Sequence, residues 1–214
     1  MGNMTGNSGS AVEGELIDLK NGVIRDTALK VDWMKNANLA FTETFGVKGI
    51  WSSGQMSWHV AQEWIAAMNA ASYLGYSDWR LPRALPSNGA SYNLAFARDG
   101  SSDFGFNIVT PNSEMMYVYH AHLGNKGYWD TSNNYQEGWG LSNIAPFENL
   151  FPSNYWTGTE VPPDLSQGHL CNLGNAEKPL KPTHAFDNFV GNGGQDFSDK
   201  GFAFFIWPVR SHEA

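Results

Sequence analysis

The stretch that most constrains the fold is Gly-Tyr-Ser-Asp-Trp-Arg-Leu-Pro at residues 75–82. Within it the charged Arg80 stands between two apolar side chains, Trp79 and Leu81. A guanidinium group is costly to bury unless a carboxylate or backbone carbonyls accept its hydrogen bonds. Pro82 stiffens the exit from the stretch. We therefore expect a structural corner that fixes a helix onto a sheet, rather than a catalytic motif.

The segment that leads into this corner has the clearest helical pattern in the chain. Ser57 is a good N-cap, because its hydroxyl can accept a hydrogen bond from a free backbone N–H of the first turn. Gly75 is suited to end the helix, since glycine adopts the left-handed conformation without strain. The pattern predicts a helix over about residues 58–74. Apolar and small side chains recur along it at helical spacing, at Ala61, Trp64, Ile65, Met68, Ala71 and Ser72.

A second, shorter helix is expected between Ser113, a suitable cap, and Gly124. Glu114 would lie in its first turn, where the helix dipole favours an acidic residue. The strands expected from alternation and turn residues are a hairpin about Asn21-Gly22 and segments 29–34, 154–160, 185–190 and 202–210. Loops or turns are expected over residues 36–54, 83–111, 125–153 and 191–201.

Aromatic and turn-forming residues are frequent. The chain has nine Trp, eight Tyr and thirteen Phe, together with 23 Gly and 10 Pro. This composition favours short strands and many turns over a helical bundle. There is no internal repeat and no linker, so we expect one domain over residues 15–214. Residues 1–14 are small and polar and are interpreted as a flexible leader, or as a start that replaces a signal peptide.

The charge of the chain excludes some classes of partner. The formal net charge is -8, and no run of Lys or Arg provides the clustered positive charge that nucleic acid or an anionic membrane surface requires. No segment approaches the roughly 18 apolar residues of a membrane span, so membrane insertion is not expected. Cys171 is the only cysteine, which rules out an internal disulfide and a cysteine cluster for zinc.

Several motifs in order resemble the Lcl C-terminal domain family, which is named for the end domain of a bacterial collagen-like adhesin. They are the strand that contains Trp33, Met56-Ser57-Trp58, the stretch 75–82, Tyr155-Trp156-Thr157-Gly158 and Trp207-Pro208-Val209-Arg210. The resemblance covers about residues 16–211. It implies an α+β fold, a single C-type-lectin-like domain in which two helices flank twisted antiparallel sheets with long loops.

The resemblance also implies a role. Several members of the family are exported or surface-located, and the named adhesin binds sulfated glycans, so the resemblance implies an extracellular, cell-surface or periplasmic recognition module. Its ligand would be a glycan or a protein. The calcium-lectin tripeptides Glu-Pro-Asn, Gln-Pro-Asp and Trp-Asn-Asp are absent, and the acidic charge argues against sulfated polyanions. An alternative is a phage-type receptor-binding or variable ligand-presenting protein on the same fold.

Six residues are expected to be structural. Arg80 and Arg210 lie in apolar surroundings at the ends of elements, and carboxylates such as Glu114 or Glu160 can hold them through paired hydrogen bonds. The alternative is that the two arginines form an anion site. Trp79 and Trp156 complete the structural set as large apolar neighbours.

Six other residues are candidates for ligand binding. Tyr135 and Trp139 stand among amides in a long loop, where their rings could stack a sugar while amides bond its hydroxyls. The alternative is that these rings fold back as a satellite cluster. In a lectin-like fold the loops before the closing strands form the recognition face, which adds Asp187, Asn188, Asn192 and Asp196.

Metal binding and catalysis find little support in the sequence. His120 and His122 are two residues apart and would point about 200° apart on a helix, so they cannot share a metal. Asp187, Asn192, Asp196 and Asp199 could supply oxygens to calcium, but their spacing matches no defined calcium loop. No nucleophile and base are paired at catalytic spacing, so we expect no enzyme and no cofactor, and a hydrolase stays as a third alternative.

Overall fold

The first and last strands that the structure describes belong to one small antiparallel sheet. The computed structural model describes residues 14–162, 170–172, 177–179 and 183–212. The sheet has the order β1-β2-β3-β11. Its strands are β1 (Leu16–Asp18), β2 (Val23–Asp26), β3 (Val31–Met34) and β11 (Val209–Ser211). The predicted hairpin at Asn21-Gly22 joins β1 to β2, and Gly22 supplies the left-handed backbone there with a φ of 89°.

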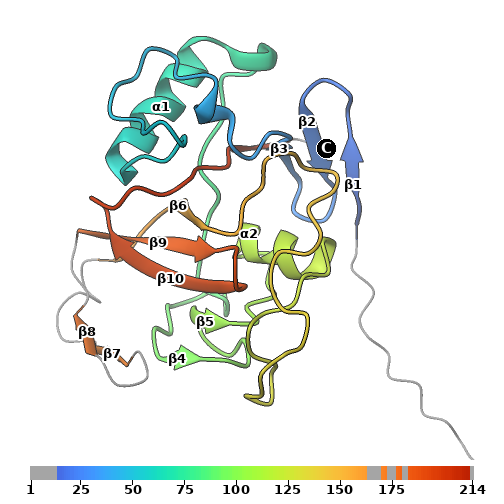
Figure 1. Cartoon of the computed structure of the whole chain (residues 1–214), viewed down its shortest axis with the longest axis vertical. Coiled ribbons are helices and arrows are strands. Elements are labelled where there is room, and N and C mark those ends of the chain that lie inside the picture. Colours follow the sequence, from blue (N-terminus) through green and yellow to red (C-terminus); the bar gives the residue numbers. More distant parts are fainter. Residues whose placement is uncertain (1–13, 163–169, 173–176, 180–182, 213–214) are drawn as a thin grey trace, which may run out of the picture.

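A larger sheet crosses the middle of the molecule (Figure 1). Its order is β4-β5-β10-β9-β6. The strands are β4 (Phe96–Ala97), β5 (Phe104–Phe106), β6 (Asn154–Glu160), β9 (His184–Phe189) and β10 (Gly194–Asp199). The other pairs in this sheet are antiparallel, as expected, whereas β4 and β5 run parallel at its edge. A further two-stranded ribbon consists of β7 (Leu170–Asn172) and β8 (Glu177–Pro179).

Two main helices accompany the sheets, as the sequence predicted. α1 (Trp58–Ala70) begins after Ser57, whose hydroxyl accepts a hydrogen bond from the N–H of Val60. The α-helix ends at Ala70 rather than near 74, because Ser72 and Leu74 adopt left-handed φ angles of 48° and 56°. The shorter helical elements are η1 (Leu39–Phe41), η2 (Tyr73–Gly75), α2 (Glu114–Tyr117) and the π-helical turn η3 (Val118–His122).

Three expectations about strands were wrong. The segment expected to be a turn over 191–201 consists mostly of strand β10. The turn itself is short, because the backbone N–H groups of Asn192 and Gly193 both donate to the Phe189 carbonyl. The strand expected over 202–210 is confined to β11, and Phe204 and Phe205 form only isolated bridges. The segment expected to be a loop over 83–111 contains β4 and β5.

The corner at residues 75–82 joins α1 to the small sheet, as the sequence indicated. The side-chain amide of Asn69 donates to the Trp79 carbonyl at 2.8 Å and accepts from the Trp79 N–H at 2.8 Å. On the other side, Arg80 and Val209 exchange backbone hydrogen bonds of 2.8 and 2.9 Å. Trp79 is 2% exposed and packs in the main core. The corner therefore connects a helix, a strand and the core within two residues.

Candidate functional site

Arg80 is held by one of the two carboxylates that the sequence offered. Its terminal nitrogens Nη1 and Nη2 each donate to a different oxygen of Glu114 at 2.7 Å. Glu114 also accepts the backbone N–H of Arg83 at 2.7 Å. Glu160 instead accepts from Lys200 at 2.5 Å, so the idea that Glu160 holds an arginine is wrong.

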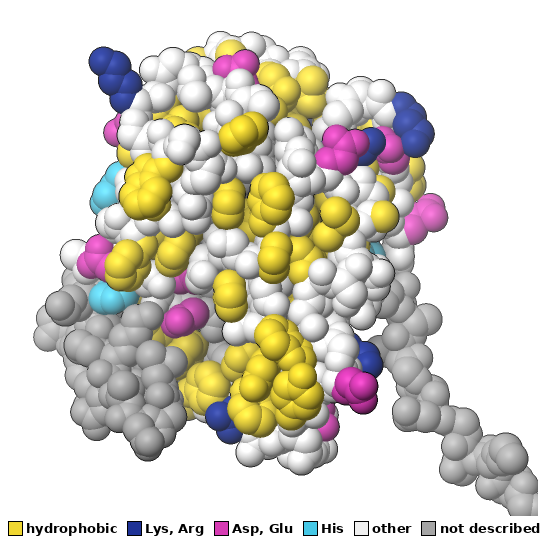
Figure 2. Space-filling model, in the orientation of Figure 1, with side chains coloured by type: hydrophobic (Ala, Val, Ile, Leu, Met, Phe, Trp, Pro, Cys, Tyr) yellow, Lys and Arg dark blue, Asp and Glu magenta, His cyan; other side chains and the backbone are white. Residues whose placement is uncertain are grey.

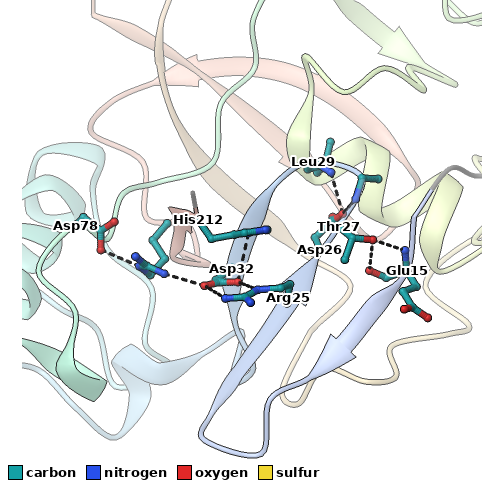
Figure 3. A network of polar contacts seen from close by, with 10 residues as sticks. Glu15, Arg25, Asp26, Thr27, Leu29, Asp32, Asp78 and His212 are labelled. Carbon is teal, nitrogen blue, oxygen red and sulfur yellow. Dashed lines mark hydrogen bonds and ion pairs between the residues drawn. The ribbon is translucent and has the colours of Figure 1, made fainter. Parts of the chain in front are cut away.

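Arg210 is held by two other carboxylates, which sequence reasoning missed. They are Asp32 and Asp78, both labelled in Figure 3. Arg210 donates to Asp32 from Nη1 and to Asp78 from Nε, both at 2.7 Å. Asp32 is fully buried on the central strand β3, and Arg25 from β2 binds its other side at 2.9 Å. Arg25 and Arg210 are the direct cross-strand neighbours of Asp32. Arg80 and Arg210 both have acidic partners, which favours the structural interpretation over an anion site.

Trp156 is buried with no exposed surface, like Trp79 in the corner. Its indole Nε1 donates to the Met56 carbonyl at 3.0 Å, and its ring packs against Phe204 with centroids 4.6 Å apart. Both predicted structural tryptophans therefore lie in the core with their N–H groups bonded.

A cavity of about 370 Å³ opens on one face of the larger sheet, and we name it the sheet cavity. The strand register explains it. Phe106, Gly194, Phe189 and Asn154 are successive cross-strand neighbours on β5, β10, β9 and β6, and all four line the cavity. Cross-strand neighbours share a face of the sheet. Gly194, which carries no side chain, stands between the two phenylalanines in this row.

Two of the predicted ligand-binding residues line the sheet cavity and two are buried. Asn192 and Asp196 line it. Asp187 is 0% exposed and accepts a hydrogen bond from the side chain of Asn154, which is itself a lining residue. Asn188 is 1% exposed and donates to Gln195 beneath the strand surface. The structure thus brings Asn192 and Asp196 together and leaves Asn188 in a buried hydrogen-bond network.

The other two predicted residues lie on an aromatic hairpin, which we define as residues 128–139. Tyr135 and Trp139 are 58% and 38% exposed, and the indole N–H of Trp139 donates to the Tyr135 hydroxyl oxygen at 3.0 Å. Tyr128 packs edge-on against both rings, at centroid distances of 5.4 and 4.8 Å. Figure 2 shows hydrophobic side chains gathered at the lower end of this face, where Figure 1 places the loop that follows α2. The rings therefore form a cluster that still presents two members to solvent.

The aromatic hairpin adjoins the sheet cavity. The Tyr128 N–H donates to the Asn192 carbonyl at 2.9 Å, which joins the hairpin to the turn before β10. Arg98 provides a second link, because it lines the cavity and lies over the Trp129 ring at 4.3 Å. Arg98 also borders a neighbouring hollow of about 390 Å³. Sequence reasoning missed Arg98, since nothing in its polar surroundings marks it as different from a surface arginine.

Two pKa shifts lie close to this region. Burial lowers the pKa of His120, whose ring nitrogens face the carbonyls of Gly193 and Asn125 at 3.2 Å each. The backbone N–H of Asn134 lowers the pKa of Asp130, which shapes the tip of the aromatic hairpin. His120 therefore supports the turn of the cavity in its neutral form, and Asp130 orders the hairpin as a carboxylate.

The structure does not gather the oxygens proposed for calcium. Asp187 and Asp196 lie opposite each other, but Asp199 is three residues further along β10, or about 10 Å at strand spacing. Within residues 14–162 and the later described segments, no group of three His, Cys, Asp or Glu side chains is placed to hold a metal ion. In the same residues no helix is long and apolar enough to cross a membrane.

The fold and the site define an α+β domain with a cavity on its larger sheet and an exposed aromatic hairpin beside it. Residues 22–85 match the family model of the Lcl C-terminal domain, which confirms the resemblance over that part of the chain. The matched part runs from the start of β2 through α1 and the corner, and the lining of the sheet cavity lies beyond it. No curated protein and no solved structure matches the chain.

Proposed function

We propose that this chain is a non-catalytic recognition module that binds a glycan or protein ligand through the aromatic hairpin, outside the cell and on a C-type-lectin-like scaffold. The match to the Lcl C-terminal domain supports an adhesin-associated module. The observation that carries the proposal is the exposure of Tyr135 and Trp139, at 58% and 38%, on a hairpin whose base is bonded to the body of the domain.

The chemistry of the hairpin suits a sugar ring. Trp and Tyr faces stack on the apolar face of a ring, and nearby amides can bond its hydroxyls. Trp139 is fixed by its hydrogen bond to Tyr135 and by the edge of Tyr128, so little side-chain freedom is lost when a ligand binds. A rigid aromatic pair of this kind is also typical of the centre of a protein–protein contact.

The test is binding to an immobilised glycan array, followed by titration of any glycan that binds. Trp139→Ala should weaken that binding by about tenfold or more, as expected for an aromatic anchor. Trp51→Ala is the matched control, because Trp51 is 63% exposed and belongs to the segment before α1. Figure 1 shows that segment at the opposite end of the molecule from the loop that follows α2.

Each outcome has a clear meaning. A glycan that binds Trp139→Ala as well as the unaltered chain would rule out the aromatic hairpin as its site. If the array gives no binding at all, the glycan part of the proposal fails and a protein ligand has to be sought with the same two variants.

A further inference from the structure

We propose that the sheet cavity is a second binding site, for a carboxylate group carried on a small apolar body, and that Arg98 is its anion anchor. This site is independent of the proposed function, because it uses the sheet face and Arg98 rather than the exposed rings of Tyr135 and Trp139.

The first observation is that Arg98 has no acidic partner among the described residues. Arg25, Arg80 and Arg210 each contact a carboxylate, at 2.9, 2.7 and 2.7 Å. Arg98 contacts none in the part of the chain that the structure describes, where the one hydrogen bond of its side chain runs from Nη1 to the Asn133 side-chain oxygen at 2.6 Å. Its Nε is buried without a hydrogen-bond partner. A half-buried guanidinium with free donors gains strongly when a carboxylate arrives.

The second observation is that Arg98 is held in place before any ligand binds. Its guanidinium lies 4.3 Å from the Trp129 ring and 5.4 Å from the Phe96 ring. The side-chain amide of Asn107 donates to the backbone carbonyls of both Arg98 and Trp129, at 2.6 and 2.8 Å. One side-chain amide thus ties together the backbones of the two residues whose side chains stack on each other. Such preorganisation lowers the entropic cost of binding.

The walls of the cavity determine what the carboxylate should carry. Phe96, Phe106 and Phe189 line it and give it apolar walls. A volume of about 370 Å³ falls near the lower end of the roughly 300–1,000 Å³ of small-molecule sites. A cavity of this size with phenylalanine walls suits an aromatic or branched aliphatic group better than a hydroxyl-rich one. Asp196 also lines the cavity, and its negative charge would repel an anion, so a ligand with more than one carboxylate is disfavoured.

Two sources share this chemistry: a free aromatic or aliphatic carboxylic acid, and the last residue of a peptide that ends in an apolar side chain. A guanidinium binds either carboxylate through two parallel hydrogen bonds. The experiment therefore compares both sources with neutral counterparts of the same shape.

The first arm uses the unaltered full chain and NMR titration with N-acetylphenylalanine and its primary amide. The acid should bind at least about tenfold more tightly than the amide, since only the acid forms a charge-assisted pair with Arg98. Equal affinity for the acid and the amide would overturn the proposal. So would the absence of any change in NMR peak positions with either compound at about 10 mM, since weaker binding would not amount to a site.

The second arm alters the protein. Arg98→Gln should bring the affinity for the acid down to that for the amide, while Arg83→Gln, at an exposed arginine outside the cavity, should leave it unchanged. A well-folded Arg98→Gln that keeps its preference for the acid would contradict us. If that variant does not fold, Phe106→Ala tests the apolar wall and should weaken the acid and the amide alike.

The third arm separates the sources. A five-residue peptide ending in Phe with a free carboxylate is compared with its amidated form. If the free peptide binds at least as tightly as N-acetylphenylalanine, the ligand is a chain terminus. If the peptide is excluded while N-acetylphenylalanine binds, the ligand is a small acid. Failure of these arms leaves the Trp139→Ala result on glycans untouched, so the two proposals fail separately.

Discussion

The Arg80 guanidinium and the Glu114 carboxylate face each other through two hydrogen bonds of 2.7 Å, one from each terminal nitrogen. The pair joins the corner at residues 75–82 to the start of α2, 34 residues later in the chain. Glu114 has a side-chain exposure of 9% and Arg80 of 21%, so solvent replaces either partner poorly. Loss of one partner should therefore leave a largely buried charge.

We expect Arg80→Met to lower the free energy of unfolding by about 2–4 kcal/mol, because Glu114 loses its counter-charge while it stays buried. Urea denaturation followed by tryptophan fluorescence measures the change. The double variant Arg80→Met with Glu114→Met should recover part of the loss. An Arg80→Met protein as stable as the original would show that the pair does not hold the corner.

Asp32→Asn should also destabilise the fold, by about 3 kcal/mol, since Asp32 is fully buried and receives Arg25 and Arg210 from the two neighbouring strands. Thermal unfolding monitored by circular dichroism gives the measurement. Asp18→Asn is the control, because Asp18 pairs with the exposed Lys20 and should change stability less. Equal effects of the two changes would contradict the importance of the buried cluster.

His120 should make the fold less stable at mildly acidic pH. Burial lowers its pKa below the ordinary value of 6.5, so the unfolded chain binds a proton at a pH where the folded chain does not. Stability is therefore complete above pH 6.5 and falls as the pH drops below that value towards the folded pKa, by up to about 1.4 kcal/mol per pH unit. The measurement compares urea midpoints at about pH 7.5 and about pH 5, which lie roughly one unit or more above and below the ordinary histidine pKa. The two midpoints should differ less for His120→Gln than for the original protein. The same difference in both proteins would assign the pH effect to other groups.

Gly105→Ala should break the edge of the larger sheet. Gly105 has a φ of 127°, and a Cβ there would overlap the Ala97 carbonyl oxygen on β4. We expect a loss of more than about 3 kcal/mol in unfolding free energy. Gly89→Ala shares the left-handed backbone but meets no atom within 4 Å, so it should cost only about 1 kcal/mol. A small loss of unfolding free energy in Gly105→Ala would indicate that β4 can move away from β5.

The parts of the fold predicted correctly are those where local rules decide. The Ser57 cap and the spacing of Trp64 and Met68 place α1, and the Asn21-Gly22 pair places the first hairpin. The partner of Arg80 was within reach because an acidic residue at the start of a helix is itself a local pattern. In each case neighbours in sequence carry the information.

The parts predicted wrongly depend on contacts between distant segments. β10 is composed of residues that favour turns, and it is a strand because β9 and β5 pair with it on both sides. Asp32 acquires its arginines through strand register, which separates Asp32 from Arg210 by 178 residues. Arg98 becomes distinctive only when Asn107 and Trp129 surround it. A single sequence does not record these neighbours.

The way the aromatic hairpin is attached has a consequence for how the domain can diversify. Its base is joined through main-chain atoms of the hairpin itself: the Tyr128 N–H donates to the Asn192 carbonyl, and the Trp129 carbonyl accepts from the side-chain amide of Asn107. Those bonds do not depend on which side chains stand at positions 135 and 139. Descendants of one ancestral gene can therefore carry other residues at these two positions and acquire new specificity while inheriting an unchanged framework.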